Sequence, residues 1–187
     1  AWFRGPDGAA AGKFEAVRRE HGAVCDAAGL FDLTSLAKVE LHGPGAVEVL
    51  ERLAVGRMDV PIGQAVPTLF CNEAGGIEAK LTVMRLAGDR FYLVTEAEHG
   101  MRMREWIRAS MPRDAKVAVD DVTSHFGTLL VAGPKARQIV RALLDAEWDS
   151  ERRDPDQGMI EIVAGIPVRM YPDDTTLSPG WQIHAPM

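Results

Sequence analysis

Cys71-Asn72-Glu73-Ala74-Gly75-Gly76-Ile77-Glu78-Ala79-Lys80-Leu81-Thr82-Val83-Met84-Arg85-Leu86 is the most informative stretch of this chain. Its glycine pair predicts a tight turn with positive φ between two apolar, strand-like runs, residues 66–70 and 81–86. Glu78 and Lys80 follow the turn two positions apart, so they share one face of the second strand. The spacing of Glu78 and Lys80 leaves two interpretations open. These charges line a pocket, or they form the solvated face of a hairpin. Spacing alone favours the solvated face.

The composition is that of an ordinary globular domain. The chain has 187 residues, of which 47% are hydrophobic and 26% charged, and this length is sufficient for a substantial core. A net charge of −6 argues against a nucleic-acid-binding surface. The two cysteines, Cys25 and Cys71, make neither a metal motif nor a disulfide framework. No apolar run approaches the roughly 18 residues of a membrane helix. We expect a cytoplasmic protein without membrane or nucleic-acid partners.

Hydrophobic periodicity and turn residues predict an α+β chain. Residues 1–12 are rich in glycine and alanine and are expected to form a linker or arm. Residues 38–42 alternate polar and apolar side chains, as a half-buried strand does, and residues 30–33 are interpreted as the break before this strand. Helices are predicted over residues 13–29, 46–53, 98–111 and 135–144, and further strands over residues 90–95, 117–122, 128–132, 159–163 and 166–171.

One pattern occurs twice. A strand, a Gly-Pro break and an amphipathic helix span residues 38–53, with the break at Gly43-Pro44, and residues 128–144, with the break at Gly133-Pro134. A repeat separated by this distance predicts two similar α+β halves rather than a solenoid.

The residues alone indicate no reaction. Metal-ligand spacing is absent from the five histidines, which are His21, His42, His99, His125 and His184. Asp173 and Asp174 form an acidic pair, but adjacent strand residues face opposite sides, so the pair does not predict a carboxylate dyad.

The hairpin resembles a known family. Asn72-Glu73-x-Gly75-Gly76-Ile77-Glu78-x-Lys80-Leu81-Thr82-Val83-x-Arg85-Leu86 is similar to the folate-binding domain of the glycine-cleavage T-protein (aminomethyltransferase) family, closest to the version in dimethylglycine and sarcosine dehydrogenases. The resemblance covers residues 2–187. Further matching motifs follow in the family's order: Gly29-Leu30-Phe31-Asp32-Leu33-Thr34-Ser35, Gly43-Pro44-Gly45-Ala46, Asp121-Val122-Thr123-Ser124, Gly133-Pro134-Lys135-Ala136-Arg137 and Gly180-Trp181.

The resemblance implies a duplicated α+β fold of ferredoxin-like, antiparallel-sheet halves over residues 13–187, as a partial domain truncated at its C-terminus. It implies tetrahydrofolate as cofactor and transfer of a methyl, methylene or aminomethyl group, linked to demethylation of an amine such as dimethylglycine or sarcosine. The implied partners are a small-molecule amine or folate and an FAD-containing oxidoreductase module or subunit. FAD is expected only on that separate or missing module.

Four positions depart from the family's pattern. Lys80 stands where the family carries its functional Asp, and Pro67 where a Tyr is expected. In the last loop Thr175 and Ser178 replace a Tyr and a folate-gripping Glu. An ammonium at position 80 repels a cationic amine, and it acts as a base only if its pKa is lowered by several units.

The resemblance implies folate or substrate contacts from Asn72, Glu78, Lys80, Arg85, Ser178 and Trp181, with no catalytic residue and no metal ligand assigned. Three hypotheses remain open. The chain is a folate-dependent transfer domain in which Lys80 faces an anionic group, a catalytically silent structural or subunit-docking module, or a regulatory domain that holds a folate-like molecule without turnover.

Overall fold

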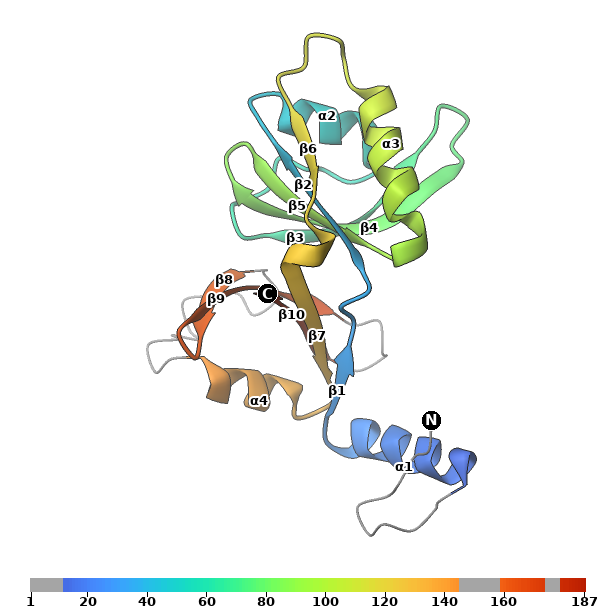
Figure 1. Ribbon diagram of the computed structural model, residues 1–187, viewed down its shortest axis with the longest axis vertical. Coiled ribbons are helices and arrows are strands. Elements are labelled where there is room, and N and C mark those ends of the chain that lie inside the picture. The colour runs from blue at the N-terminus through green and yellow to red at the C-terminus, as the bar shows by residue number, and fades with distance from the viewer. Residues whose placement is uncertain (1–11, 145–158, 174–178) are drawn as a thin grey trace.

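The fold consists of two antiparallel five-stranded sheets with helices on their outer faces (Figure 1). The computed structural model describes residues 12–144, 159–173 and 179–187. The predicted α+β class with two antiparallel-sheet halves is confirmed. The arm predicted over residues 1–12 lies outside the described residues except for Gly12.

The first sheet has the strand order β3-β4-β5-β2-β6. Its strands are β2 (Ala37–His42), β3 (Ala65–Cys71), β4 (Ile77–Ala87), β5 (Arg90–Thr95) and β6 (Ala118–Asp121). Helices α2 (Ala46–Leu53) and α3 (Gly100–Ser110) cover one face, and a 3-10 turn, η1 (Ala97–His99), precedes α3. Apolar side chains that alternate along the strands pack against the helices and form the larger core, which includes Leu41, Leu50, Phe91, Leu93 and Ile107.

The second sheet has the strand order β1-β7-β10-β9-β8. Its strands are β1 (Gly29–Asp32), β7 (Phe126–Ala132), β8 (Met159–Val163), β9 (Ile166–Asp173) and β10 (Gly180–Pro186). Helix α4 (Ala136–Leu143) covers the outer face over a core that includes Val131, Val140, Met170 and Trp181. Helix α1 (Lys13–Asp26) leads into β1, projects from the body of the molecule (Figure 1) and has no buried residue. The 3-10 turn η2 (Thr123–His125) joins β6 to β7.

Residues 30–33, interpreted from sequence as a break, are mostly strand. β1 pairs with β7, and Gly29 lies opposite Ala132. The sequence interpretation missed this strand because its partner comes about a hundred residues later. β1 belongs to the second sheet and β2 to the first, so the short segment between them crosses from one sheet to the other.

The two Gly-Pro breaks adopt the same local structure. Gly43 and Gly133 have φ values of 130° and 126°, a region that L side chains rarely adopt. Each glycine carbonyl accepts a hydrogen bond from the first helical N–H, that of Ala46 or Ala136. The two strand–break–helix units therefore occupy equivalent places, one on each sheet.

The prediction that β2 is half buried is wrong. All residues from Ala37 to Leu41 are buried, because the helices cover one face of the strand and the second sheet covers the other. Lys38 is fully buried and donates from Nζ to the carbonyl oxygens of Thr34 and Leu36, at 2.8 and 3.0 Å.

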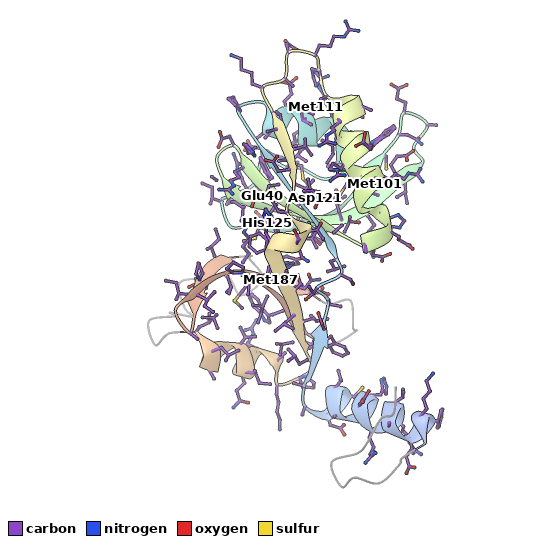
Figure 2. All side chains as sticks on the ribbon, in the orientation of Figure 1. Glu40, Met101, Met111, Asp121, His125 and Met187 are labelled. Atoms are coloured by element: carbon purple, nitrogen blue, oxygen red, sulfur yellow. The ribbon has the colours of Figure 1, made fainter. Side chains whose placement is uncertain are left out.

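Glu40 is buried at the junction of the two sheets, where Figure 2 labels it. It accepts hydrogen bonds from Arg90 of the first sheet and from Arg169 of the second, the latter at 2.6 Å. The guanidinium carbon of Arg169 lies 4.3 Å from the ring centres of both Tyr92 and Phe126. Burial acts to raise the pKa of Glu40, but the hydrogen bonds and charges of both arginines together outweigh it and hold this pKa below its usual value. A buried polar network therefore joins the sheets.

Candidate functional site

The β3–β4 hairpin brings the conspicuous motif to the gap between the sheets. Lys80 lies opposite Leu69 and Thr82 opposite Pro67 in the antiparallel register. Ala79, Leu81 and Val83 belong to the core under the helices, so the alternate residues of β4 face the second sheet. Met84, on that alternate face, belongs to the same small buried cluster as Tyr171 of the second sheet.

A pocket of about 590 Å³ lies between this face and the second sheet. The first sheet supplies β3, β4 and β5, the second supplies β9 and β10, and the segment between β1 and β2 closes one side. The lining is Leu33, Leu36, Ala65, Pro67, Thr68, Leu69, Lys80, Leu81, Thr82, Val94, Thr95, Glu96, Tyr171, Pro172, Asp173 and Gln182. Half of these residues are apolar and half carry polar groups, and the volume is in the range of small-molecule sites, about 300–1,000 Å³.

Lys80 brings a positive charge to the first-sheet wall of the pocket. Its carbonyl oxygen accepts a 2.7 Å hydrogen bond from the hydroxyl of Thr95, which fixes the backbone beneath the side chain. The residue is exposed, so its ammonium is hydrated and available to a ligand entering from solvent. Pro67 also lines the pocket, on the edge strand β3. Proline is tolerated there because an edge strand can leave a ladder position without a donor.

The second-sheet wall carries a hydrogen-bonded chain of buried polar residues. The hydroxyl of Tyr171 donates to Oε1 of Gln182 at 2.7 Å, and Nε2 of Gln182 donates to Oδ2 of Asp173. All three line the pocket, and their exposed fractions are 2%, 8% and 9%. The carboxylate of Asp173 is therefore presented to the pocket by a fixed amide.

His184 stands behind this wall. Its ring stacks on Tyr171 with centroids 5.2 Å apart, and its Nδ1 lies 3.0 Å from the hydroxyl of Thr128 and 3.2 Å from that of Tyr92. Burial, together with the positive charges of Lys38 and Arg169, lowers the pKa of His184 to about 3. The imidazole is therefore neutral at physiological pH and acts as a packing and hydrogen-bonding support.

Asn72 organises the tip of the hairpin. Its Oδ1 accepts hydrogen bonds from the backbone N–H groups of Ala74 and Gly76, and its Nδ2 donates to Glu78 at 2.8 Å. A Cβ at position 76 would lie 2.8 Å from Nδ2 of Asn72, so a larger residue there would displace the Asn72 side chain. The hydrogen bonds from Asn72 and from Arg102 lower the pKa of Glu78 and pin it to the hairpin and to α3.

Arg85 and Trp181 also contact protein groups. The guanidinium of Arg85 donates to Val60 at 2.7 Å, to Gly88 at 2.8 Å and to the carboxylate of Asp59. Trp181 is 4% exposed in the core under α4. Five of the residues expected to contact a ligand are among the described residues. Lys80 lines the pocket, and the others do not belong to its described lining residues: Asn72, Glu78, Arg85 and Trp181. Ser178 and Thr175 lie outside the described residues.

Sequence reasoning missed the wall formed by Tyr171, Asp173 and Gln182. The acidic pair at positions 173–174 was the available signal. A pair of adjacent acids does not predict a site until the residues opposite them on the neighbouring strand are known. The register places Gln182 opposite Tyr171 and Gly180 opposite Asp173, which brings the amide and the carboxylate together.

Glu96, at the rim of the pocket, belongs to a second acidic group. Among the described residues, Glu96, Glu98 and His99 bring three potential ligand atoms within 4.8 Å of one another. All three are at least partly exposed, as acidic surface groups commonly are, and no second feature of a metal site accompanies them. Within the described part of the chain, no helix is both long and apolar enough to cross a membrane.

Comparisons with known proteins agree with this architecture. The chain is 36% identical over 153 residues to 4-methylaminobutanoate oxidase (formaldehyde-forming) of Paenarthrobacter nicotinovorans, a match that covers 81% of this chain and 18% of that protein. The chain thus spans about a fifth of the length of this curated relative.

Two solved structures share the fold. Aminomethyltransferase T of the glycine cleavage system from Bartonella henselae superposes with a TM-score of 0.74 at 25% identity, over 90% of this chain and 44% of that one. A chain of the heterotetrameric sarcosine oxidase from Corynebacterium sp. U-96, in complex with pyrrole 2-carboxylate, superposes with a TM-score of 0.65 at 16% identity, over 92% of this chain and 84% of that one. The GCVT N-terminal domain family matches residues 1–184. The resemblance seen in the sequence is confirmed: this chain belongs to the GCVT N-terminal domain family.

Proposed function

We propose that the pocket between the sheets binds tetrahydrofolate and receives a one-carbon unit released by oxidation of an N-methylated amine. The observation that carries this proposal is the pocket itself, about 590 Å³ in volume and lined by the family's hairpin. Leu33, Leu36 and Leu69 offer apolar surface for a flat pterin ring. Tetrahydrofolate would supply the nitrogen that accepts the carbon, while the residues of the chain bind and orient it.

Lys80 selects for negative charge in this proposal. An exposed ammonium on the pocket wall attracts carboxylates, and the glutamate tail of a folate carries at least two. Lys80 would thus hold the tail of the cofactor rather than the amine. The positive charge of Lys80, opposite to that of the family's Asp, changes the ligand group recognised at this position and leaves the pocket open.

The source of the carbon is proposed to be a separate flavin-containing oxidoreductase module or subunit. The relative from Paenarthrobacter is named for oxidising 4-methylaminobutanoate and forming formaldehyde, and the sarcosine oxidase is named as a heterotetramer. Both names describe oxidation of an N-methylated amino acid. We therefore propose an amine of this class, such as dimethylglycine, sarcosine or 4-methylaminobutanoate, as the donor substrate.

Isothermal titration calorimetry with tetrahydrofolate under anaerobic conditions tests the proposal. We expect saturable binding at one site per chain, weakened by increasing salt because Lys80 is an exposed charge. Absence of heat at millimolar tetrahydrofolate would eliminate folate binding and with it the transfer function.

A second candidate function is a catalytically silent module that docks an oxidase subunit. The specific observation in its favour is Lys80, whose charge is opposite to that of the family's Asp. Under this alternative the pocket is a remnant, and tetrahydrofolate does not bind. The calorimetric titration therefore separates the two functions.

A further inference from the structure

We propose that Asp173 is the pocket carboxylate that contacts an N–H group of the ligand, in place of the carboxylate absent from position 80. This inference rests on the proposed function, because it concerns the same pocket. The first-sheet wall carries the ammonium of Lys80, and the second-sheet wall carries the carboxylate of Asp173 on β9.

The first step is the position of Asp173. It lies at the end of β9, lines the pocket and is only 9% exposed, so its carboxylate is shielded from bulk water. Electrostatic interactions and hydrogen bonds are stronger in such surroundings than on an open surface. A ligand N–H that reaches this carboxylate therefore makes a strong, charge-assisted hydrogen bond.

The second step is the orientation of the carboxylate. An amide side chain can present either its oxygen or its nitrogen to a neighbour. Here Oε1 of Gln182 accepts from the hydroxyl of Tyr171, so Nε2 faces Asp173. Tyr171 is fixed in turn by its stack on His184. Gln182 is a positioning residue in this chain, because its amide N–H binds Oδ2 and fixes the orientation of the Asp173 carboxylate.

The third step is the charge pattern of the pocket. Lys80 places an ammonium on the first-sheet wall and Asp173 a buried carboxylate on the second-sheet wall, while Glu96 adds an exposed carboxylate at the rim. The complementary ligand carries an N–H donor in one part and a carboxylate in another. Tetrahydrofolate has this pattern, with ring N–H groups and a glutamate tail, and so does a protonated N-methylated amino acid. The shared chemistry is an amine nitrogen joined to a carboxylic acid.

The experiment measures the dissociation constants of two probes, tetrahydrofolate and dimethylglycine. The variants are Asp173→Asn, which removes the charge at nearly constant shape, and Asp173→Glu, which keeps the charge. Asp89→Asn is the matched control, because Asp89 is an exposed acid in the β4–β5 turn, outside the described lining. We expect Asp173→Asn to weaken binding of at least one probe by about 10- to 100-fold. Asp173→Glu should recover part of the loss, and Asp89→Asn should match the unmodified chain.

A measurement on the unmodified chain keeps the test independent of how the variants fold. Dimethylglycine should bind about tenfold more tightly than trimethylglycine, which lacks the N–H group that Asp173 would accept. If dimethylglycine binds the unmodified chain and trimethylglycine binds it with equal affinity, the inference is overturned.

The outcomes separate this inference from the proposed function. If Asp173→Asn leaves tetrahydrofolate binding unaffected, the proposed function is supported. The role of Asp173 is then overturned, unless Asp173→Asn weakens dimethylglycine binding. Binding of dimethylglycine alone, lost in Asp173→Asn, supports the role of Asp173 and eliminates folate. If neither probe binds, both proposals fail.

Gln182→Met tests the positioning step. This variant removes the amide donor, so we expect a smaller loss of affinity for the same probe than Asp173→Asn produces. In the double variant the Gln182 effect should disappear, because Gln182 acts through Asp173. Independent, additive losses would contradict the hydrogen-bonded chain as the route of the effect.

Discussion

Lys80 decides how the pocket chemistry is interpreted. It is exposed, belongs to the pocket lining, and has its backbone fixed by Thr95. An acid at this position would attract a cationic amine, whereas the ammonium attracts carboxylates. The charge at one position therefore determines which end of a ligand can approach the first-sheet wall.

Comparison of Lys80→Met with Lys80→Asp tests this charge selection. With tetrahydrofolate triglutamate as ligand, we expect a modest weakening in Lys80→Met, about three- to fivefold, because exposed ion pairs contribute only about 1 kcal/mol or less. Lys80→Asp should weaken binding further through repulsion. The measurement is calorimetry with the monoglutamate and the triglutamate at two salt concentrations. A triglutamate preference that survives charge reversal would contradict the role given to Lys80.

The β3–β4 hairpin separates residues that shape the site from residues that face the ligand. Asn72 holds the turn, Glu78 is fixed by Asn72 and Arg102, and Arg85 fastens the far end of β4 to a neighbouring loop. All three were expected to contact a ligand, and that role stays a prediction. Their observed contacts support a structural role within the described residues.

Asn72→Ala distinguishes the two roles. Loss of its backbone hydrogen bonds at the turn should lower the free energy of unfolding by about 1–2 kcal/mol. Affinity for tetrahydrofolate should change less than twofold, because Asn72 is outside the described lining of the pocket. Urea denaturation and calorimetry on the same samples measure both quantities. A large loss of affinity with unchanged stability would instead make Asn72 a ligand contact.

Local sequence patterns predicted most elements but not the strand that depends on a distant partner. Helix α2 and strand β5 have the predicted bounds, because their periodicity and turn residues are encoded within a few positions. Residues 29–32 become β1 because β7 supplies hydrogen-bonding partners a hundred positions later. No local pattern carries that information.

The candidate site was predictable on one wall and hidden on the other. The hairpin motif pointed to Lys80, and the family resemblance pointed to Pro67, and both line the pocket. Tyr171, Asp173 and Gln182 were not proposed as site residues. Their relation arises from the register of β9 with β10 and from the packing of one sheet on the other, neither of which the sequence displays.

The junction between the sheets holds the two walls of the pocket in place. Lys38 and Glu40 of β2 are buried there, and Arg169 and His184 approach from the second sheet. Polar and apolar side chains alternate along β2, which predicted a half-buried strand. A face exposed to solvent and a face covered by polar partners give the same alternation in the sequence. Hydrogen bonds join Glu40 to Arg169 across the junction, although among the described residues Nη1 of Arg169 and Nε2 of His184 are buried without a hydrogen-bond partner. Burying these groups carries a desolvation cost.

The neutral state of His184 makes the stability of the fold sensitive to mild acid. The folded-state pKa is about 3 and the ordinary value is 6.5. In the unfolded chain the imidazole of His184 therefore binds a proton below pH 6.5, whereas in the folded chain it stays neutral down to about pH 3. The contribution of His184 is complete above pH 6.5 and declines through this window, by up to about 1.4 kcal/mol per pH unit.

Urea denaturation between pH 7 and pH 4.5 checks this contribution. His184→Gln should be less stable at pH 7 but should lose stability with falling pH less steeply than the unmodified chain, because the titrating group is gone. His125→Gln is the matched control, since His125 is exposed. Parallel pH profiles for the unmodified chain and His184→Gln would show that the buried imidazole does not titrate in this window.

Binding of tetrahydrofolate to the pocket between the sheets is tested most directly by filling the pocket. Thr82 lines it from β4, so Thr82→Trp should occupy the space of the ligand. Ile77→Trp is the matched control, because Ile77 is 62% exposed at the hairpin tip and outside the described lining. We predict saturable calorimetric binding to the unmodified chain and to Ile77→Trp, and at least tenfold weaker binding to a folded Thr82→Trp variant. No saturable binding to the unmodified chain, or equal binding to Thr82→Trp, would contradict a folate site in this pocket.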